Sequence, residues 1–459
     1  MKKRKDRILT GLLGDARLDK RLKVLTEQLN AMPTAMLPQA LSSWSSLKAG
    51  YRFMNNAHVT QKAIIETERQ ETLQRLSNMP AGMVLAVQDT TSFNFGNRPA
   101  LEGLGVLEDN QTPGFFAHTT LAVSEKGVPL GVLDQQVWSR SQNRQRDKEA
   151  HKFKPITENE SFKWLQGLRH LHEIEQHVVV ICDREADIYE LFQHVHEHDL
   201  DLIVRAVRNR RLEEAPLLRD HLGDIVATDH FQVIVQRQRN QAERTASVEL
   251  RYATVTLLPP KRQKSAEAFP LTPQQLQVVE VKEINVPKTV KDPIHWILVT
   301  TLAVNTVEDA HRIVRLYTYR WLVERFHYVL KSGGCHFEES QLRTVAALHR
   351  LLAVCSRVAW RLLWLTYQTR QTPHVPCTLA LSEAEWQALT ALTNPSSQPD
   401  PFPPSLHQAV RSIAKLGGFI GRKSDGEPGV KTLWRGWQRL QDIVATWLLS
   451  HPPPDMGNG

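Results

Sequence analysis

Three acidic residues, far apart in the chain, stand where a divalent cation could be bound. Asp89 and Asp183 each end a short apolar run that is typical of a buried β-strand, and Glu324 lies on a long predicted helix. Carboxylate oxygens are the ligands that Mg²⁺ and Mn²⁺ prefer. Two such ions about 4 Å apart can activate an attacking oxygen and stabilise the leaving oxygen of a phosphodiester. Taken singly, an Asp at a strand end is more often a turn or cap residue.

A stripe of polar residues on the same helix is the stronger signal. Its members lie at offsets of 0, 3, 7 and 14 and are Tyr317, Arg320, Glu324 and Lys331. At ~100° per residue they fall within an arc of about 60°. An acid flanked by two cations and a phenol suits one metal ligand between phosphate-binding groups. The alternative is a surface helix that carries an i,i+4 ladder of ion pairs.

The elements that must position these residues are predicted to form a mixed α/β core. Apolar or β-branched runs predict strands over 83–89, 118–125, 128–138, 178–183, 200–207 and 295–301. Similar runs at 231–235, 248–257 and 277–285 predict an added β-rich segment. Periodicity predicts helices over 160–174 and 188–196, and one long helix over 307–332 that ends at Gly333-Gly334.

Both ends of the chain are predicted to be helical. Leucines spaced by three and four predict an amphipathic helix from Arg17 to Leu29, with two more over 42–53 and from about Thr60. Residues 1–60 hold 11 Lys/Arg and 4 Asp/Glu, so nearly all of the net charge of +8 lies there. This favours a polyanion-binding end, with DNA or RNA as first candidates, although a solvated basic tail has the same charge. A linker over 369–378 precedes a helical region over 379–449.

Length and composition exclude several classes of protein. A chain of 459 residues is too long for one compact core, so two or three domains are expected. No apolar run reaches the ~18 residues of a membrane span, and the N-terminal apolar stretch is too short for a signal peptide, so we expect a cytoplasmic protein. The four cysteines form no CxxC pair, which supports neither a zinc site nor a disulfide framework.

Together these residues resemble the DDE transposases of bacterial insertion sequences, and among them the transposon-five group. The helical stripe matches the Y-(2)-R-(3)-E-(6)-K signature of that family. The similar segments follow in order along nearly the whole chain and are 13–17, 50–53, 89–92, 182–188, 317–327 and 433–437. Two features depart from the pattern: Gln88 stands where the nearest relatives have an acidic residue, and Glu185 and Asp187 are extra carboxylates beside Asp183.

The resemblance implies a fold and a reaction. It implies a helical domain that binds DNA ends (1–60), a ribonuclease-H-like catalytic core (61–370) with a β insertion at about 208–290, and a helical dimerisation domain (371–459). It implies that Asp89, Asp183 and Glu324 are catalytic and hold two Mg²⁺ ions, with Mn²⁺ as a substitute. The implied reaction is cut-and-paste transposition, in which both strands are cut through a hairpin and the 3′ ends join target DNA. A homodimer would hold two ends in a synaptic complex.

The same resemblance implies a set of DNA contacts. Trp296 would stack on a flipped base, because a hairpin bends the backbone sharply and an extruded base relieves that bend; core packing is the alternative. Phosphates around the bend would be held by Tyr317, Arg320 and Lys331. Further contacts are expected from basic residues of the head, Arg17, Arg21 and Arg52, and from the cluster Arg208, Arg210 and Arg211.

Two other functions stay open at this stage. A DNA-binding regulator, or a domesticated relative that no longer cuts, would need neither the carboxylates nor the metal, and all three carboxylates are present. A metal-dependent nuclease without strand transfer would share the carboxylates but would have little use for the basic head or for Trp296.

Overall fold

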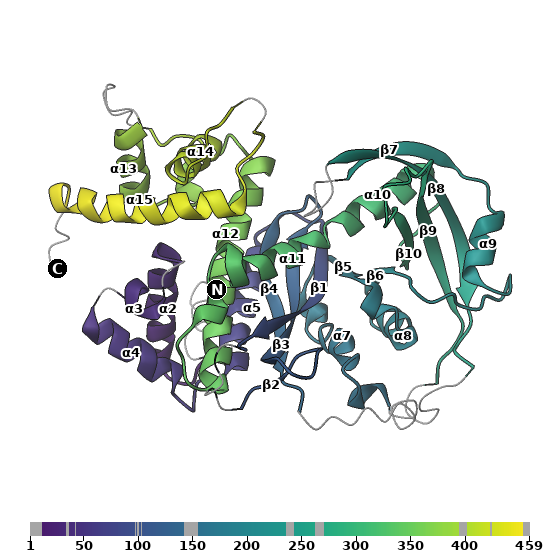
Figure 1. Ribbon diagram of the computed structural model, residues 1–459, viewed down its shortest axis with the longest axis horizontal. Helices are drawn as coiled ribbons and strands as arrows, with labels where there is room; N and C mark the ends of the chain where they lie inside the picture. The colour runs from purple at the N-terminus through teal and green to yellow at the C-terminus, as the bar shows by residue number, and fades with distance from the viewer. Residues whose placement is uncertain are drawn as a thin grey trace.

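The computed structural model describes residues 12–33, 36–41, 43–96, 98, 101, 103–141, 155–235, 243–261, 270–393, 402–422 and 425–452. One β-sheet runs through the middle and right of the molecule in Figure 1, and the helices of the two chain ends lie together at the left. The predicted mixed α/β class is confirmed, with a helical part at each end of the chain.

The sheet has ten strands in the order β2-β3-β1-β5-β6-β10-β9-β8-β7, with β4 paired to β3 off this path. Their bounds are β1 (Met83–Asn94), β2 (Gly105–Val106), β3 (Pro113–Ser124), β4 (Pro129–Trp138), β5 (His177–Cys182), β6 (Asp201–Arg205), β7 (Asp229–Val235), β8 (Arg244–Leu257), β9 (Gln274–Ile284) and β10 (His295–Thr300). The strands β1, β5 and β6 run parallel, and all other pairs are antiparallel. The added strands β7 to β9 extend the sheet through β10.

Helices cover both faces of this sheet. Their bounds are α7 (Phe162–Gln166) and α8 (Tyr189–Glu197) on one face, and α10 (Val307–Thr318), α11 (Trp321–Tyr328) and α12 (Val345–Gln371) on the other. The run Val178–Cys182 of β5 is buried on both faces, which is why it reads as a continuous apolar segment. Alternate residues of β1 and β5 therefore belong to two separate cores.

The helices of the chain ends complete the molecule. At the N-terminal end they are α2 (Ala16–Ala31), α3 (Leu37–Ala40), α4 (Trp44–Met54) and α5 (Gln61–Ser77), and at the C-terminal end α13 (Glu383–Thr393), α14 (Leu406–Leu416) and α15 (Val430–Ser450); α9 (Leu218–Asp224) precedes β7. The two ends touch, because the Trp437 indole N–H donates to the carbonyl of Asn30 at 3.0 Å. Among the helices of the described ranges, none has the length and apolar character needed to cross a membrane.

Four details of the predicted elements are wrong. The strand that carries Asp89 does not end there but continues to Asn94, since residues up to Asn94 pair with β3. The helix predicted over 160–174 is α7 followed by 3-10 turns, and the linker predicted at 369 begins inside α12. The helix predicted over 307–332 breaks at Tyr319 and ends in a π-helical turn, Val329–Gly333.

The position of the helix break has a packing cause. The Tyr319 ring lies against Gly127 in the turn between β3 and β4, so closely that a Cβ at Gly127 would lie 2.5 Å from the ring. Gly127 has a φ of +80°, which favours glycine at this turn on its own account. The junction between α10 and α11 therefore packs against the turn between β3 and β4.

Candidate active site

Asp89 and Asp183 lie side by side on neighbouring parallel strands. The last paired residues of β1 and β5 are Val87 and Ile181, and each Asp stands two residues further on, on the same face of the sheet. The Asp183 carboxylate caps the following 3-10 turn, where it accepts from the Glu185 backbone N–H at 2.8 Å. Burial raises the pKa of Asp183, and the negative charges of Asp89 and Glu185 add to that effect.

Glu324 reaches the same place from α11. The helix packs on β1. Glu324 forms an ion pair with Arg320, with a guanidinium nitrogen 2.6 Å from a carboxylate oxygen. Burial alone would lower the pKa of Arg320, but the Tyr317 phenol and the charges of Glu324 and Asp89 raise it above its usual value. Arg320 therefore lies within reach of carboxylates from both elements. The Arg320 side chain is only 14% exposed. The alternative of a surface helix that carries a ladder of ion pairs therefore does not apply to this pair.

The three carboxylates fit a divalent cation. They supply only oxygen ligands, from β1, from the end of β5 and from α11. The raised pKa of Asp183 means that its surroundings disfavour the negative charge of its carboxylate. A bound cation offsets the cost of keeping this carboxylate ionised, so the three carboxylates are more stable with the ion than without it.

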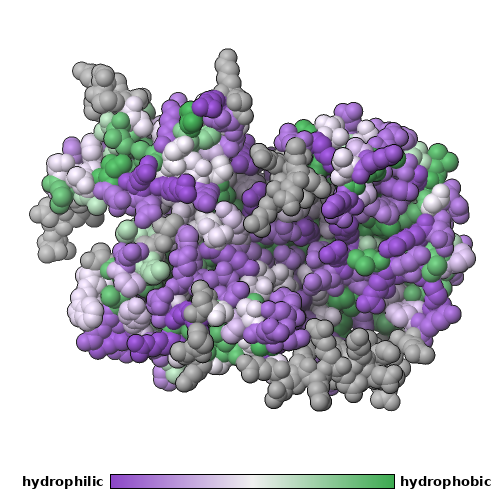
Figure 2. Space-filling model, in the orientation of Figure 1, coloured by the Kyte–Doolittle hydropathy of each residue, from purple (hydrophilic) through white to green (hydrophobic). Residues whose placement is uncertain are grey.

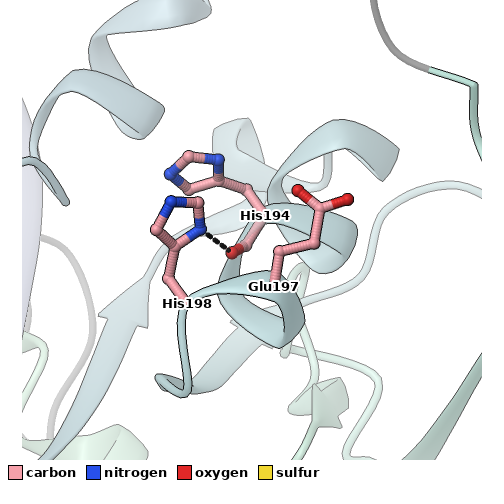
Figure 3. A group of neighbouring side chains, drawn as sticks. All are labelled: His194, Glu197 and His198. Carbon is pink, nitrogen blue, oxygen red and sulfur yellow. Dashed lines mark hydrogen bonds between the residues drawn. The ribbon is translucent and has the colours of Figure 1, made fainter.

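A second group of possible ligands lies at the C-terminal end of α8, on the other face of the sheet. Figure 3 shows His194, Glu197 and His198, whose ligand atoms lie within 4.8 Å of one another. The two imidazole rings stack with centroids 4.0 Å apart and planes inclined by 28°. The Nδ1 of His198 also donates to the carbonyl of His194 at 2.9 Å. An ion is bound close to the plane of each imidazole, and stacked rings share no such position, so we do not assign a metal to this group.

Three predicted DNA-contacting residues lie near the three carboxylates: Asp183 acts on the pKa of Tyr317, Asp89 acts on that of Lys331, and Trp296 contacts Tyr317. The Trp296 and Tyr317 rings form a T-shaped contact, with centroids 5.4 Å apart and planes at 69°. Burial raises the pKa of Tyr317 to about 12, so the phenol keeps its proton. The Lys331 ammonium lies 5.5 Å from the centre of the Phe93 ring. Burial lowers the pKa of Lys331, while Glu338, Glu108 and Asp89 act in the opposite direction.

Two buried histidines were not predicted, one beside Asp89 and one on the opposite face of β1. The Nδ1 of His327 lies 3.6 Å from an Asp89 carboxylate oxygen, and its Nε2 has no hydrogen-bond partner among the described residues. His118 lies on the opposite face, between Gln88 at 3.0 Å and Thr90 at 2.9 Å. Burial, and then the positive charges nearby, hold the pKa of His118 well below its usual value.

These contacts explain where Gln88 points and how His327 could have been found. Gln88 is fully buried on the face away from Asp89, so it takes no part in the carboxylate group. His327 is three residues beyond Glu324 and therefore shares its side of α11. That spacing was the available signal in the sequence.

The predicted arginine contacts have different surroundings. Arg17 is exposed and pairs with Asp15 at 2.8 Å, Arg52 is exposed on α4, and Arg21 is half-buried. Further along the chain, Arg208 is exposed. Arg210, also predicted to contact DNA, has a buried side chain in an ion pair with Asp187. The neighbouring Arg211 donates to the carbonyl of Pro259 at 2.6 Å.

Asp187 has a structural role that its neighbours lack. Its second carboxylate oxygen accepts from the backbone N–H groups of Val207 and Arg208, at 2.8 and 2.7 Å. We expect Asp187→Ala to lower the free energy of unfolding by about 3 kcal/mol, because it leaves the buried Arg210 without a counter-charge. The control is Glu185→Ala, whose side chain is 63% exposed and should change stability by less than ~0.5 kcal/mol. Equal urea midpoints for the two variants would contradict this assignment.

Comparison with known protein families gives three matches in chain order. Residues 7–59 match the family "Transposase DNA-binding", residues 153–360 match "Transposase DDE domain", and residues 357–448 match "Transposase Tn5 dimerisation domain". Asp183 and Glu324 fall inside the DDE match, whereas Asp89 lies before it and is assigned from the geometry above. A solved structure, "Cryo-EM structure of piggyBac transposase synaptic complex with hairpin DNA (SNHP)", aligns with 95% of this chain and 72% of its own at 9% identity and a TM-score of 0.38.

The three family matches agree with the elements described above. The helical N-terminal part is a DNA-binding domain, the sheet with its covering helices is a DDE core of the ribonuclease-H-like class, and the helical C-terminal part is a dimerisation domain. A DDE core works with divalent metal, in keeping with the oxygen ligands of the site. The chain belongs to the Tn5 family of DDE transposases.

Proposed function

We propose that this transposase binds the inverted repeats at transposon ends, cuts both strands through a hairpin and joins the 3′ ends to target DNA. The observation that carries the proposal is the meeting of Asp89, Asp183 and Glu324 beside the pair Trp296 and Tyr317. The carboxylates suit phosphodiester chemistry, and the aromatic pair suits a DNA strand that is sharply bent next to it.

The protein groups divide the chemical work among them. Asp89, Asp183 and Glu324 would hold two Mg²⁺ ions, for which Mn²⁺ can substitute, and the bound metal supplies activation of the attacking oxygen and stabilisation of the leaving oxygen. Arg320 stands next to these carboxylates and donates to the phosphate under attack. The protonated Tyr317 and the Lys331 ammonium bind neighbouring phosphate oxygens.

Trp296 has a separate task in the hairpin step. It is half-buried in β10 and in contact with Tyr317, so part of the ring is accessible to an extruded base. We expect Trp296→Ala to slow hairpin formation about tenfold while first-strand nicking stays within threefold of wild type, because stacking contributes ~1–3 kcal/mol per base. Denaturing gels of labelled end DNA separate nicked from hairpin products.

The matched control for this prediction is Trp296→Phe, which keeps an aromatic face. It should retain most of the hairpin product. If the Ala variant forms hairpins at the wild-type rate, Trp296 has only a packing role in the sheet.

The ends of the chain would assemble the reacting complex. We assign residues 1–60 to the binding of the terminal repeats, residues 61–370 to catalysis and residues 371–459 to dimerisation. The phosphates of the repeats would be contacted by Arg17, Arg21 and Arg52 and, from the core, by Arg208. Hydrophobic residues gather on α13 and at the end of α15 in the upper left of Figure 2, where Leu392, Leu448 and Leu449 are exposed. Such a patch supports pairing of two copies through this domain, so that a homodimer holds two ends in a synaptic complex.

Incubation of the protein with end-bearing DNA, a target plasmid and Mg²⁺ tests the proposed function. Nicked, hairpin and joined products are all expected. Binding without any cleavage would instead indicate a regulator, and nicks without hairpins or joined products would indicate a nuclease. Either outcome overturns the proposal.

A further inference from the structure

A hydrogen-bonded chain of three side chains lies behind Asp89, on the other face of β1. The His118 Nε2 lies 3.0 Å from the Gln88 Oε1, and the His118 Nδ1 lies 2.9 Å from the Thr90 hydroxyl oxygen. An amide oxygen only accepts, so Nε2 carries the proton. Burial holds the pKa of His118 well below its usual value, so the ring is neutral and Nδ1 accepts from Thr90. One imidazole therefore joins the two residues that stand directly before and after Asp89.

Most of this chain is shut off from water. Gln88 and His118 are fully buried, and Thr90 lies directly opposite His118 in the pairing of β1 with β3. The Gln88 Nε2 has no hydrogen-bond partner among the described residues. A buried amide with an unpaired donor is costly, so the bond from His118 to the other end of the amide carries weight. That bond holds the Gln88 side chain in one orientation.

The helix α7 packs against the chain from behind. The Trp164 indole makes a T-shaped contact with the His118 ring, with centroids 4.6 Å apart and planes at 80°. At the C-terminal end of α7, a Cβ on Gly167 would lie 2.7 Å from the Gln88 Oε1. The helix backbone therefore lies directly on the amide. Neither the imidazole nor the amide can shift unless α7 shifts too.

The Asp89 side chain depends on the strand for its position. Side chains alternate along a strand, so Asp89 points away from its two neighbours. The Asp183 carboxylate is held by a hydrogen bond from the Glu185 backbone N–H. In the described part of the chain no hydrogen bond holds the Asp89 carboxylate in this way, and its contact with the His327 Nδ1 is 3.6 Å long. The backbone on either side of Asp89 therefore sets where its carboxylate stands.

We propose that His118 is a positioning residue for the metal site: it ties Gln88 to Thr90 and so fixes the part of β1 that carries Asp89. The inference rests on the proposed function, in which Asp89 is a metal ligand. Residues that orient a metal ligand contribute about 10- to 100-fold in metal affinity. Because His118 acts through the backbone, we expect an effect of about tenfold, at the lower end of that range.

The test removes the hydrogen bonds but keeps an aromatic ring. His118→Phe retains the packing against Trp164 and loses both hydrogen bonds. We expect it to raise the Kd of the full-length protein for Mn²⁺ about tenfold, measured from the free-ion signal in electron paramagnetic resonance spectra. The Mg²⁺ concentration for half-maximal nicking should rise in proportion, while the nicking rate at saturating Mg²⁺ stays within about threefold of wild type.

Two milder variants act on the same chain. His118→Gln keeps a donor and an acceptor and should recover part of the Mn²⁺ affinity. Gln88→Leu cuts the chain at its other end and also removes the unpaired donor, so it tests the link even if His118→Phe folds poorly. It should raise the Kd for Mn²⁺ in the same direction.

Tyr189→Phe is the matched control. The Tyr189 hydroxyl lies 2.8 Å from the carbonyl oxygens of Leu257 and Thr272, so this variant also removes buried hydrogen bonds, but at the end of β8. It should lower the thermal midpoint and leave Mn²⁺ binding unchanged.

The inference is overturned if His118→Phe and Gln88→Leu bind Mn²⁺ within twofold of wild type. It is also overturned if Tyr189→Phe loses as much affinity, because the effect would then be one of general stability. Failure of the proposed function has a different signature, in which wild type does not nick end DNA or Asp89→Ala binds Mn²⁺ as wild type does.

Discussion

Replacement of Asp89, Asp183 or Glu324 by Ala is expected to lower DNA cleavage by at least about 10⁴-fold, while binding of end DNA stays within about threefold of wild type. Each variant removes one of the carboxylates that meet from β1, β5 and α11, so the metal that activates the attacking oxygen is no longer held. End binding depends instead on the phosphate contacts of the helical head. A nicking assay with Mg²⁺ and a gel-shift assay on the same preparations measure the two quantities.

Glu185→Ala is the matched control for this prediction. Glu185 lies two residues from Asp183, but its side chain is 63% exposed and contacts Lys163 at 3.4 Å. It should keep cleavage within about threefold of wild type. If Glu185→Ala loses cleavage and Asp183→Ala retains it, the wrong carboxylate has been assigned to the metal.

The positions of Asp183 and Glu324 followed from the sequence because local patterns determine both. A continuous apolar run that ends in Asp is typical of a central parallel strand, and β5 has that form, with Asp183 directly after it. The polar residues around Glu324 stay together although the helix breaks at Tyr319. Arg320 and Glu324 lie on the same side of the break, and the Trp296 contact brings Tyr317 to the same group.

The length of β1 and the break at Tyr319 could not be predicted in the same way. Thr90, Thr91 and Ser92 form a polar run that suggests a loop, but each has a partner on β3, which keeps them in the strand. Asp89 is therefore a mid-strand residue, paired with Thr119 of β3. The break depends on Tyr319 packing against Gly127, a contact between residues almost 200 positions apart.

The three clustered arginines show a further limit of sequence patterns. Arg208, Arg210 and Arg211 look alike along the chain, yet one is exposed, one is buried against Asp187 and one donates to a backbone carbonyl. The partner of Arg210 lies 23 residues earlier, and nothing in the spacing identifies it. Charge alone predicted a surface role, whereas the ion pair and the two backbone hydrogen bonds of Asp187 give Arg210 a structural one.

Arg320→Ala is expected to lower cleavage about 10³-fold, the second largest effect in the site. The guanidinium is the one positive group in ion-pair contact with Glu324 in the described structure, at 2.6 Å. Despite burial, Tyr317 and then Glu324 and Asp89 raise its pKa. A positioned arginine that meets the charge developing on a phosphoryl group contributes about 10³- to 10⁵-fold in related chemistry. Single-turnover nicking of pre-bound end DNA measures the loss directly.

Metal titration separates the two ways in which Arg320 acts. If the arginine served only to orient Glu324, a higher Mg²⁺ concentration would restore the rate, because the defect would lie in metal binding. If it donates to the phosphate, as we expect, the rate stays low at saturating Mg²⁺, and Arg320→Lys recovers only part of it because the ammonium lacks the planar pair of donors. Arg312→Gln, which removes an arginine from α10 that pairs with Glu125, should leave nicking unchanged. Full recovery of Arg320→Ala at high Mg²⁺ would assign the residue to Glu324 alone.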